Sequence, residues 1–409
     1  MMPVLDTSIK TKLVDGSTDL GGKGWVLKDY IIDVYPNLIP GVKTPALWMW
    51  GLGGLGQLGD NNTNPKSSPV QTIAGGVNWK QVACGSITAG VKTDGTLWVW
   101  GRNTNGHLGD NTSISRSSPV QTVAGGTNWT QASADLYLSA GVKSDGTLWT
   151  WGRNLQGSVG DNSTIPRSSP VQTVAGGTNW TQVSCGYNTC GCIKSDVTLW
   201  TWGRNINGQV GDNTAASKSS PVQTVTRGTT WKQVSCGYNV TAGVKTDGTL
   251  WLWGLGTSGQ LGDNTIVSKS SPIQTVAGGT NWAQVSCGNS HCAGVKSDGT
   301  LWLWGSNIGG RLGDNTIISK SSPIQTISGG STWKQVSCGY THTACIKSDG
   351  TLWAWGSNQN GSCGDNTVVA RSSPVQTVTP MTTWKQVSCV ATTFSSPQSR
   401  TAAIADGNY

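Results

Sequence analysis

The chain has 409 residues, a formal net charge of +8 and only 12% charged residues. Because the basic residues are spread evenly along it, the charge indicates a mildly basic surface rather than a nucleic-acid groove. No stretch approaches the length of a membrane span, and the N-terminus lacks the apolar core of a signal peptide. We therefore expect neither a nucleic-acid partner nor a membrane span.

The first segment, residues 1–40, does not match the rest of the chain. It holds a polar, Gly-rich piece and then an apolar run, Tyr30–Tyr35, that reads as one strand. We interpret residues 1–40 as an N-terminal arm that anchors the protein or assembles it with others.

From residue 41 onwards the chain is a repeat. The motif LWxWG occurs seven times; the first step is 50 residues and each later step is 51. A fixed period of this length indicates one supersecondary unit that is stacked many times. The second tryptophans of the seven copies are Trp50, Trp100, Trp151, Trp202, Trp253, Trp304 and Trp355.

Each repeat predicts four short strands. In the copy that begins at Thr241, an Asp-Gly turn separates the first two strands, a long loop precedes the third, and a Gly-Gly turn precedes the fourth. The expected strands are Ala242–Lys245, Leu250–Trp253, Ile273–Val276 and Trp282–Cys287. Four antiparallel strands per repeat are typical of a propeller blade, so residues 41–409 are predicted to form an all-β, seven-bladed β-propeller.

Two further expectations concern the arrangement of the blades. Each blade carries three tryptophans, which we expect to fill the wedge between neighbouring sheets. The first strand of the unit has small residues, so we expect it at the crowded position nearest the axis.

The ends of the chain predict how the ring closes. The last repeat supplies only Trp384–Cys389 and Thr401–Ala405, so the N-terminal strands should complete its blade and remove the open edges. Gly41–Lys43 also resembles the strand that Thr401–Ala405 would form. We expect Thr401–Ala405 to be inserted and Gly41–Lys43 to lie outside.

The cysteines and histidines do not indicate catalysis or metal binding. Six of the 11 Cys occupy one repeat position, which suits buried free thiols in a reducing cytosol better than a disulfide framework. No CxxC pair or Cys/His ligand set occurs, and the three His have no repeated triad partners. We therefore expect no enzyme activity, no catalytic residues, no cofactor and no metal.

The pattern LWxWGxNxxGxLGDN…SSPVQTV…WKQVSCG resembles the RCC1 repeat family of seven-bladed propellers across residues 41–409. Cys338–Thr343 is most similar to the family motif, whereas other copies depart from its Gly-His-Thr. The sequence of the repeat is also similar to that of RCC1-like proteins from marine and cyanobacterial bacteriophages. This resemblance implies a virion structural role in the tail or capsid. Family members that exchange nucleotide on a small GTPase insert a wedge loop, and no blade here has such an insertion.

Differences among the seven copies predict an interaction face. The Cys-Gly connections and the long loops should emerge on one face, and the nearly identical Asp-Gly and Gly-Gly turns on the other. Loops on a rigid scaffold commonly bind partners, and exposed Tyr and Arg commonly anchor them. Drift in tolerant loops explains the variation equally well. The candidate residues are Arg102, Arg153, Arg204, Tyr187, Tyr238, Tyr340 and His342.

A basic residue precedes every Ser-Ser-Pro and follows a loop Asp by six residues. We favour a salt bridge within each blade over a ring that docks an acidic partner. These residues are Lys66, Arg116, Arg167, Lys218, Lys269, Lys320 and Arg371.

Three functional hypotheses follow. The first is a non-enzymatic bacteriophage virion protein, assembled in the host cytoplasm, whose residues 1–40 contact other virion proteins and whose variable face binds a host-surface receptor or glycan. The second is an intracellular RCC1-like adaptor or regulator of a small GTPase. The absence of a wedge insertion argues against this hypothesis. The third is a glycan-active enzyme. The sequence shows no pair of carboxylates of the kind that such enzymes use, which argues against this hypothesis.

Overall fold

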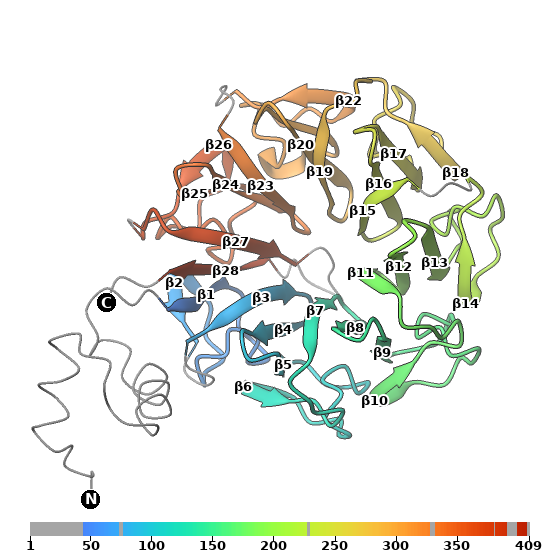
Figure 1. The fold of residues 1–409 in the computed structure, drawn as a ribbon. Coiled ribbons are helices and arrows are strands. Elements are labelled where there is room, and N and C mark those ends of the chain that lie inside the picture. The colour runs from blue at the N-terminus through green and yellow to red at the C-terminus, as the bar shows by residue number, and fades with distance from the viewer. Residues whose placement is uncertain are drawn as a thin grey trace, which may run out of the picture.

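The computed structural model describes residues 44–72, 77–226, 230–327, 332–379, 381–390 and 399–406. Within these ranges, the chain forms 28 strands and one short 3-10 turn, η3 (Ile308–Gly310). The strands form seven four-stranded antiparallel sheets arranged around a central axis (Figure 1). The predicted seven-bladed propeller is confirmed, whereas the predicted arm, residues 1–40, and Gly41–Lys43 lie outside the described residues.

Each blade contains four strands at increasing distance from the axis. The innermost strands are β3 (Trp79–Cys84), β7 (Trp129–Ala134), β11 (Trp180–Gly186), β15 (Trp231–Cys236), β19 (Trp282–Cys287), β23 (Trp333–Cys338) and β27 (Trp384–Cys389). The second strands are β4 (Ile87–Lys92), β8 (Leu138–Lys143), β12 (Thr189–Lys194), β16 (Val240–Lys245), β20 (His291–Lys296), β24 (His342–Lys347) and β28 (Arg400–Asp406). The third strands are β1 (Pro45–Gly51), β5 (Leu97–Gly101), β9 (Leu148–Gly152), β13 (Leu199–Gly203), β17 (Leu250–Gly254), β21 (Leu301–Gly305) and β25 (Leu352–Gly356). The outermost strands are β2 (Lys66–Gln71), β6 (Arg116–Gln121), β10 (Arg167–Gln172), β14 (Lys218–Gln223), β18 (Lys269–Gln274), β22 (Lys320–Gln325) and β26 (Arg371–Gln376).

The expectation that the small-residue strand lies nearest the axis is wrong. Residues of all seven tryptophan-led strands, β3 to β27, line one central cavity of about 220 Å³. The small residues of the second strand instead make room for the tryptophan beside them. A Cβ on Gly90 would lie 2.4 Å from Cζ3 of Trp79, and one on Gly243 would lie 2.5 Å from Cζ3 of Trp231.

Strands from both ends of the chain form the closing blade, as predicted. Its sheet has the order β2-β1-β28-β27, and Figure 1 shows the red strands β27 and β28 beside the blue strands β1 and β2. Strand β28 pairs with β1 from Pro45↔Asp406 to Gly51↔Arg400. The insertion of Thr401–Ala405 is therefore confirmed, and the ring has no open blade edge at this point.

Tryptophans fill the spaces between blades. Trp79 and Trp100 of one blade contact each other, with ring centroids 5.8 Å apart, and share a buried cluster with Leu47 and Ile404 of the closing blade. Seven such clusters are present among the described residues. Because burial of large aromatic rings removes extensive apolar surface from water, these clusters stabilise the contact of each blade with the next.

The second tryptophan of each LWxWG motif also forms a hydrogen bond to the preceding blade. Its indole Nε1 donates to a backbone carbonyl oxygen in the long loop of that blade, at 2.7–2.9 Å. The seven bonds are Trp50 to Ser362, Trp100 to Gln57, Trp151 to His107, Trp202 to Ser158, Trp253 to Gln209, Trp304 to Gln260 and Trp355 to Arg311.

A ring of glutamine side chains joins the innermost strands. Within a blade, each innermost strand pairs on one side only, so its other row of backbone groups needs partners elsewhere. The Gln233 amide supplies them to the next blade: Oε1 accepts from the Val285 N–H at 2.8 Å, and Nε2 donates to the Val285 carbonyl at 3.1 Å. In every blade the Gln Oε1 accepts in this way; the pairs are Gln81–Ala132, Gln131–Val183, Gln182–Val234, Gln233–Val285, Gln284–Val336, Gln335–Val387 and Gln386–Val82.

Serines two positions further along form a second ring. The hydroxyl of Ser235 accepts a hydrogen bond from the Cys287 N–H of the next blade at 3.0 Å. Six blades have this bond, and the seventh has Ala83 at the serine position. The two rings hold the innermost strands in a fixed register, and so fix where the loops beyond them begin.

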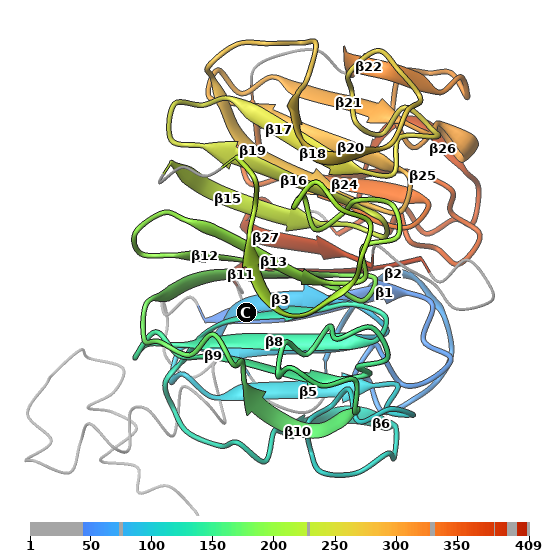
Figure 2. The same cartoon turned by 90° about the vertical axis from the view of Figure 1, so that its right-hand side faces the viewer.

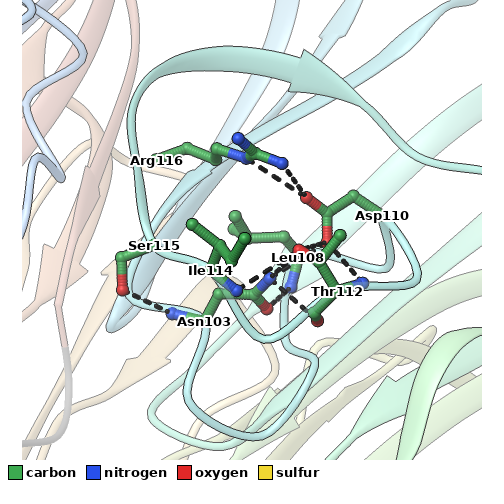
Figure 3. A network of polar contacts seen from close by, with 7 residues as sticks. All are labelled: Asn103, Leu108, Asp110, Thr112, Ile114, Ser115 and Arg116. Carbon is green, nitrogen blue, oxygen red and sulfur yellow. Dashed lines mark hydrogen bonds and ion pairs between the residues drawn. The ribbon is translucent and has the colours of Figure 1, made fainter.

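In five of the seven blades an Asn–Asp pair folds the long loop between the third and outer strands, and Figure 3 shows the pair of Asn103 with Asp110. Asn103 Nδ2 donates to Asp110 Oδ1 at 3.0 Å, and Asn103 Oδ1 accepts from the Leu108 N–H at 2.9 Å. Asp110 Oδ1 also accepts from the Thr112 N–H and hydroxyl, while Arg116 binds Oδ2 at 3.3 Å. Burial raises the pKa of Asp110, but these hydrogen bonds outweigh that effect and hold its pKa below 3.8.

All three histidines of the chain are buried. His107 and His342 are both 0% exposed. Burial lowers the pKa of each from 6.5 to about 3, and nearby arginines add to the shift. Both rings are therefore neutral at pH 7.

The glutamine ring leads to a first prediction. Gln233→Ala leaves the N–H and carbonyl of Val285 without their partner, which we expect to lower the free energy of unfolding by about 1–3 kcal/mol. Urea denaturation measures the change. Lys232→Ala, at an exposed position of the same strand, is the matched control and should stay within about 0.5 kcal/mol. Equal denaturation midpoints for the two variants would show that the ring contributes no stability.

The titrating groups predict how stability depends on pH. The histidines have lowered pKa values in the folded state, so their contribution is complete above 6.5 and is lost as the pH falls from 6.5 towards 3. The aspartates contribute fully above 3.8, and that contribution is lost as the pH falls further. We expect the urea midpoint to decline in these two windows. His342→Asn should make the decline in the upper window shallower without abolishing it, because His107 and His291 also have lowered pKa values, and it should leave the lower window unchanged. An unchanged slope in the upper window would contradict the assignment.

Candidate functional site

The loops emerge on two faces, as predicted, and Figure 2 shows the blades from the side. We call one of them the loop face: it carries the short connections between the innermost and second strands and the long loops between the third and outer strands. Within each blade the two loops are joined by a backbone hydrogen bond. The seven bonds run from Leu52 to Ser399, Arg102 to Ser86, Arg153 to Tyr137, Arg204 to Asn188, Leu255 to Asn239, Ser306 to Ser290 and Ser357 to Thr341.

Three tyrosines from successive blades contact one another on the loop face, and we call them the tyrosine ladder: Tyr137, Tyr187 and Tyr238. The ring centroids of Tyr137 and Tyr187 are 5.5 Å apart, and those of Tyr187 and Tyr238 are 4.3 Å apart. Tyr137 is 2% exposed, whereas Tyr187 and Tyr238 are half-buried. Each ring is carried by the connection that leaves an innermost strand, so the ladder lies beside the mouth of the central cavity.

Two of the candidate arginines cover rings of the ladder. The Arg153 guanidinium lies 4.3 Å from the Tyr137 ring centroid, and that of Arg204 lies 5.1 Å from the Tyr187 centroid. Arg204 Nη1 also donates to Asn239 Oδ1 of the next blade at 2.9 Å. A guanidinium stacked on an aromatic ring is attracted by its electron-rich face, so these side chains are held in place rather than freely mobile.

A pocket of about 280 Å³ opens at the start of the ladder. Arg102 and Arg153 line it together with Tyr137, Asn105, Leu155 and Pro166. Leu155 is 57% exposed, so the pocket combines positive charge with an accessible apolar side chain. Arg102 Nε donates to Thr104 Oγ1 at 3.1 Å.

Tyr340 lies on the loop face apart from the ladder, because the blade between it and Tyr238 carries Asn289. Its backbone N–H donates to the Val390 carbonyl at 2.6 Å. The expectation that His342 belongs to the exposed face is wrong. This side chain is 0% exposed, and its Nε2 contacts Thr401 Oγ1 of the next blade at 2.9 Å.

Sequence reasoning missed Tyr137 and two buried arginines. Tyr137 sits one position further along its loop than the other tyrosines, at the repeat position where the next two repeats have Asn188 and Asn239. Arg311 replaces the Gln, Ser or His of other repeats, and its Nη1 donates to the Tyr340 carbonyl at 3.1 Å. Arg400 contacts the carbonyl oxygens of Gly85 and Leu52 across the closing seam. Burial lowers the pKa of Arg311 and of Arg400 to about 10.

The basic ring forms ion pairs within its own loops. In six blades the basic nitrogen lies 2.5–3.8 Å from the loop aspartate, and these distances confirm the salt-bridge interpretation there. Lys320 occupies the same position in the remaining blade. The pairs are Lys66–Asp60, Arg116–Asp110, Arg167–Asp161, Lys218–Asp212, Lys269–Asp263 and Arg371–Asp365.

Metal-binding clusters and membrane helices are both absent from the part of the chain that the structure describes. No group of three or more His, Cys, Asp or Glu side chains there could hold a metal ion. No helix there has the length and apolar character needed to cross a membrane.

Comparison with known proteins places these features in a family. The model of the Regulator of chromosome condensation (RCC1) repeat matches residues 46–87, 94–135, 145–193, 198–244, 247–295, 298–346 and 349–392. The chain is 31% identical over 233 residues to the ultraviolet-B receptor UVR8 of Arabidopsis thaliana; the match covers 56% of this chain and 52% of UVR8. It is 26% identical over 240 residues to the human E3 ubiquitin-protein ligase HERC2, which covers 57% of this chain and 5% of HERC2.

Two solved structures share the fold. Human WBSCR16 superposes with a TM-score of 0.76 at 19% identity, covering 90% of this chain and 100% of that structure. Yeast RCC1 (Prp20), solved with Kap60 bound, superposes with a TM-score of 0.77 at 17% identity and covers 92% of each chain. Because the family model matches all seven repeats, this chain belongs to the RCC1 repeat family.

Proposed function

We propose that this chain is a non-enzymatic, protein-binding propeller that docks its partner on the loop face, at the tyrosine ladder. The single observation that carries the proposal is the stack of Tyr187 on Tyr238, with Arg204 held over it by Asn239. Half-buried tyrosines and ordered arginines bind protein partners at low entropic cost, because few of their rotamers remain to be lost.

The chemistry of the loop face suits a partner with acidic and apolar side chains. Arg153 and Arg204 supply positive charge above the rings, and the chain as a whole carries a net charge of +8. Leu155 and Ile206 follow these arginines in their loops and are 57% and 55% exposed. Accessible apolar side chains next to arginine and tyrosine are typical of interface centres.

The relatives support an adaptor or regulator more than a virion protein. Yeast RCC1 (Prp20) was solved with Kap60 bound, and Prp20p of Saccharomyces cerevisiae, the subject of another structure, binds Gsp1p and histones. We propose adaptor binding rather than nucleotide exchange on a small GTPase, because the seven LWxWG motifs recur at steps of 50 or 51 residues and leave no room for an insertion between them. The one longer connection, from Cys389 to Thr401 in the closing blade, has seven more residues than its equivalent from Cys338 to Thr343.

Placement of the chain in a virion, with residues 1–40 against other virion proteins and the loop face on a host-surface receptor or glycan, stays a prediction. It rests on the resemblance to bacteriophage proteins, and none of the relatives named above supports it.

The docking proposal predicts which side chains affect binding. A photo-cross-linking residue at position 206, beside Arg204, should capture the partner from the source cells, whereas one at Val276 on the opposite face should not. With the captured protein purified, Tyr238→Ala should raise Kd at least about fivefold, since central aromatic residues of interfaces contribute more than about 1 kcal/mol. Calorimetric titration measures this value.

Two controls make this test specific. Val276 is 55% exposed, so Val276→Ser should leave Kd unchanged, and Arg204→Glu should weaken binding while keeping the ladder rings. Equal melting temperatures separate lost binding from lost folding. A partner that binds Tyr238→Ala normally and Val276→Ser weakly would place docking on the opposite face.

A separate truncation tests the predicted arm. Deletion of residues 1–40 should leave the melting temperature of the propeller unchanged, because the closing blade is built from β1, β2, β27 and β28. If the chain is a virion protein, the truncated protein should also fail to assemble with particles in a reconstitution assay. Unfolding of the truncated protein would show that the arm takes part in ring closure.

A further inference from the structure

Two pairs of thiols face each other directly across neighbouring strands. Cys287 of β19 is the register partner of Cys292 of β20, and their Sγ atoms are 3.1 Å apart. Cys185 of β11 is likewise the partner of Cys190 of β12, with Sγ atoms 4.0 Å apart. All four side chains are buried and reduced in the structure.

Both pairs occupy the kind of strand position that a disulfide can bridge. The next register pair beyond Cys287–Cys292 is Gly288–His291, in which the Gly288 N–H donates to the His291 carbonyl at 2.9 Å. The Cys287 N–H instead leaves the blade and bonds to Ser235 Oγ, and the Cys185 N–H bonds to Ser133 Oγ. The cysteines therefore form non-hydrogen-bonded pairs, in which Cα atoms are about 4.5 Å apart and side chains lie close. A disulfide accepts Cα separations from about 4.4 Å.

Comparison of the seven blades gives an independent observation. In the other blades, the residue at the position of Cys190 and Cys292 is a Thr or Ser whose hydroxyl donates to the long-loop carbonyl of the preceding blade. These bonds are Thr88 to Gln57, Ser139 to His107, Thr241 to Gln209, Thr343 to Arg311 and Thr401 to Ser362. Cys190 and Cys292 replace that hydroxyl, and in both blades the new thiol faces a cysteine already present.

We propose that Cys185–Cys190 and Cys287–Cys292 are oxidation sites that form cross-strand disulfides by exchange with a small-molecule disulfide such as oxidised glutathione. One protein thiolate attacks the reagent, forms a mixed disulfide and releases one glutathione thiolate. The second protein thiolate attacks the mixed disulfide and releases the other. Two protein thiols are thus oxidised to one disulfide, while one glutathione disulfide is reduced to two thiols.

Burial decides when this exchange can occur. It raises the pKa of Cys185, Cys190 and Cys292, so few thiolates are present, and the packed blades exclude the reagent. The exchange can therefore take place while the chain folds in an oxidising compartment, or when a blade opens locally. Once formed, the bond between Cys185 and Cys190 would close the connection that carries Tyr187, which fixes a ring of the tyrosine ladder.

Peptide mapping of the full chain tests the proposal. The chain is refolded with oxidised glutathione, free thiols are alkylated, and the protein is digested without reduction. Each pair lies within one tryptic peptide, so the expected result is a loss of two hydrogens and of two alkylation sites, with fragment ions that assign 185–190 and 287–292. Cys236 and Cys338, which face Thr241 and Thr343, should be alkylated.

Two substitutions keep the result interpretable. Cys292→Thr restores the residue of other repeats and should abolish the 287–292 linkage while the melting temperature is retained. Thr241→Cys copies the paired geometry into a third blade and should create a 236–241 linkage under the same conditions. Full alkylation of Cys185, Cys190, Cys287 and Cys292 after oxidative refolding would overturn the proposal, as would linkage of Cys236 or Cys338 to other cysteines as readily as linkage within the two pairs.

Discussion

The structure depends on hydrogen bonds that pass from each blade to the next through side chains. An innermost strand pairs with only one neighbour, so half of its backbone groups face the next blade. The amide of Gln233, like its six equivalents, takes the place of the missing strand by accepting from one N–H. The tryptophan indoles add a second set of bonds further from the axis. Because both sets follow the repeat, small changes between copies alter the loops without moving the blades.

Much of this fold could be predicted from the repeat alone. The 51-residue period and the LWxWG motif indicate the blades, and the incomplete last repeat indicates closure by Thr401–Ala405. The radial order of strands could not be derived in this way, because a repeat has no natural starting point. Small residues at Gly90 and Gly243 suggested crowding at the axis, whereas the crowding comes from Trp79 and Trp231 in the same sheet.

The loop face was only partly predictable, for reasons that differ between residues. Variation among copies indicated Arg153, Arg204 and the half-buried tyrosines, since these columns change while the scaffold does not. The ring contacts could not be foreseen, because they join loops about 50 residues apart and include Tyr137, which lies at another repeat position. His342 resembled a surface residue in sequence but is held inside by Thr401, which lies in the neighbouring blade, 59 residues further along the chain.

The most direct test of the account is a structure of the chain with its captured partner. The account predicts that the partner covers Tyr187, Tyr238 and Arg204 on the loop face and that the Asp-Gly turns stay exposed. The innermost strands and their glutamine ring should be unchanged by binding. A partner seated on the Asp-Gly turns, with the tyrosine ladder still exposed to solvent, would contradict the central claim that this propeller binds through its loop face.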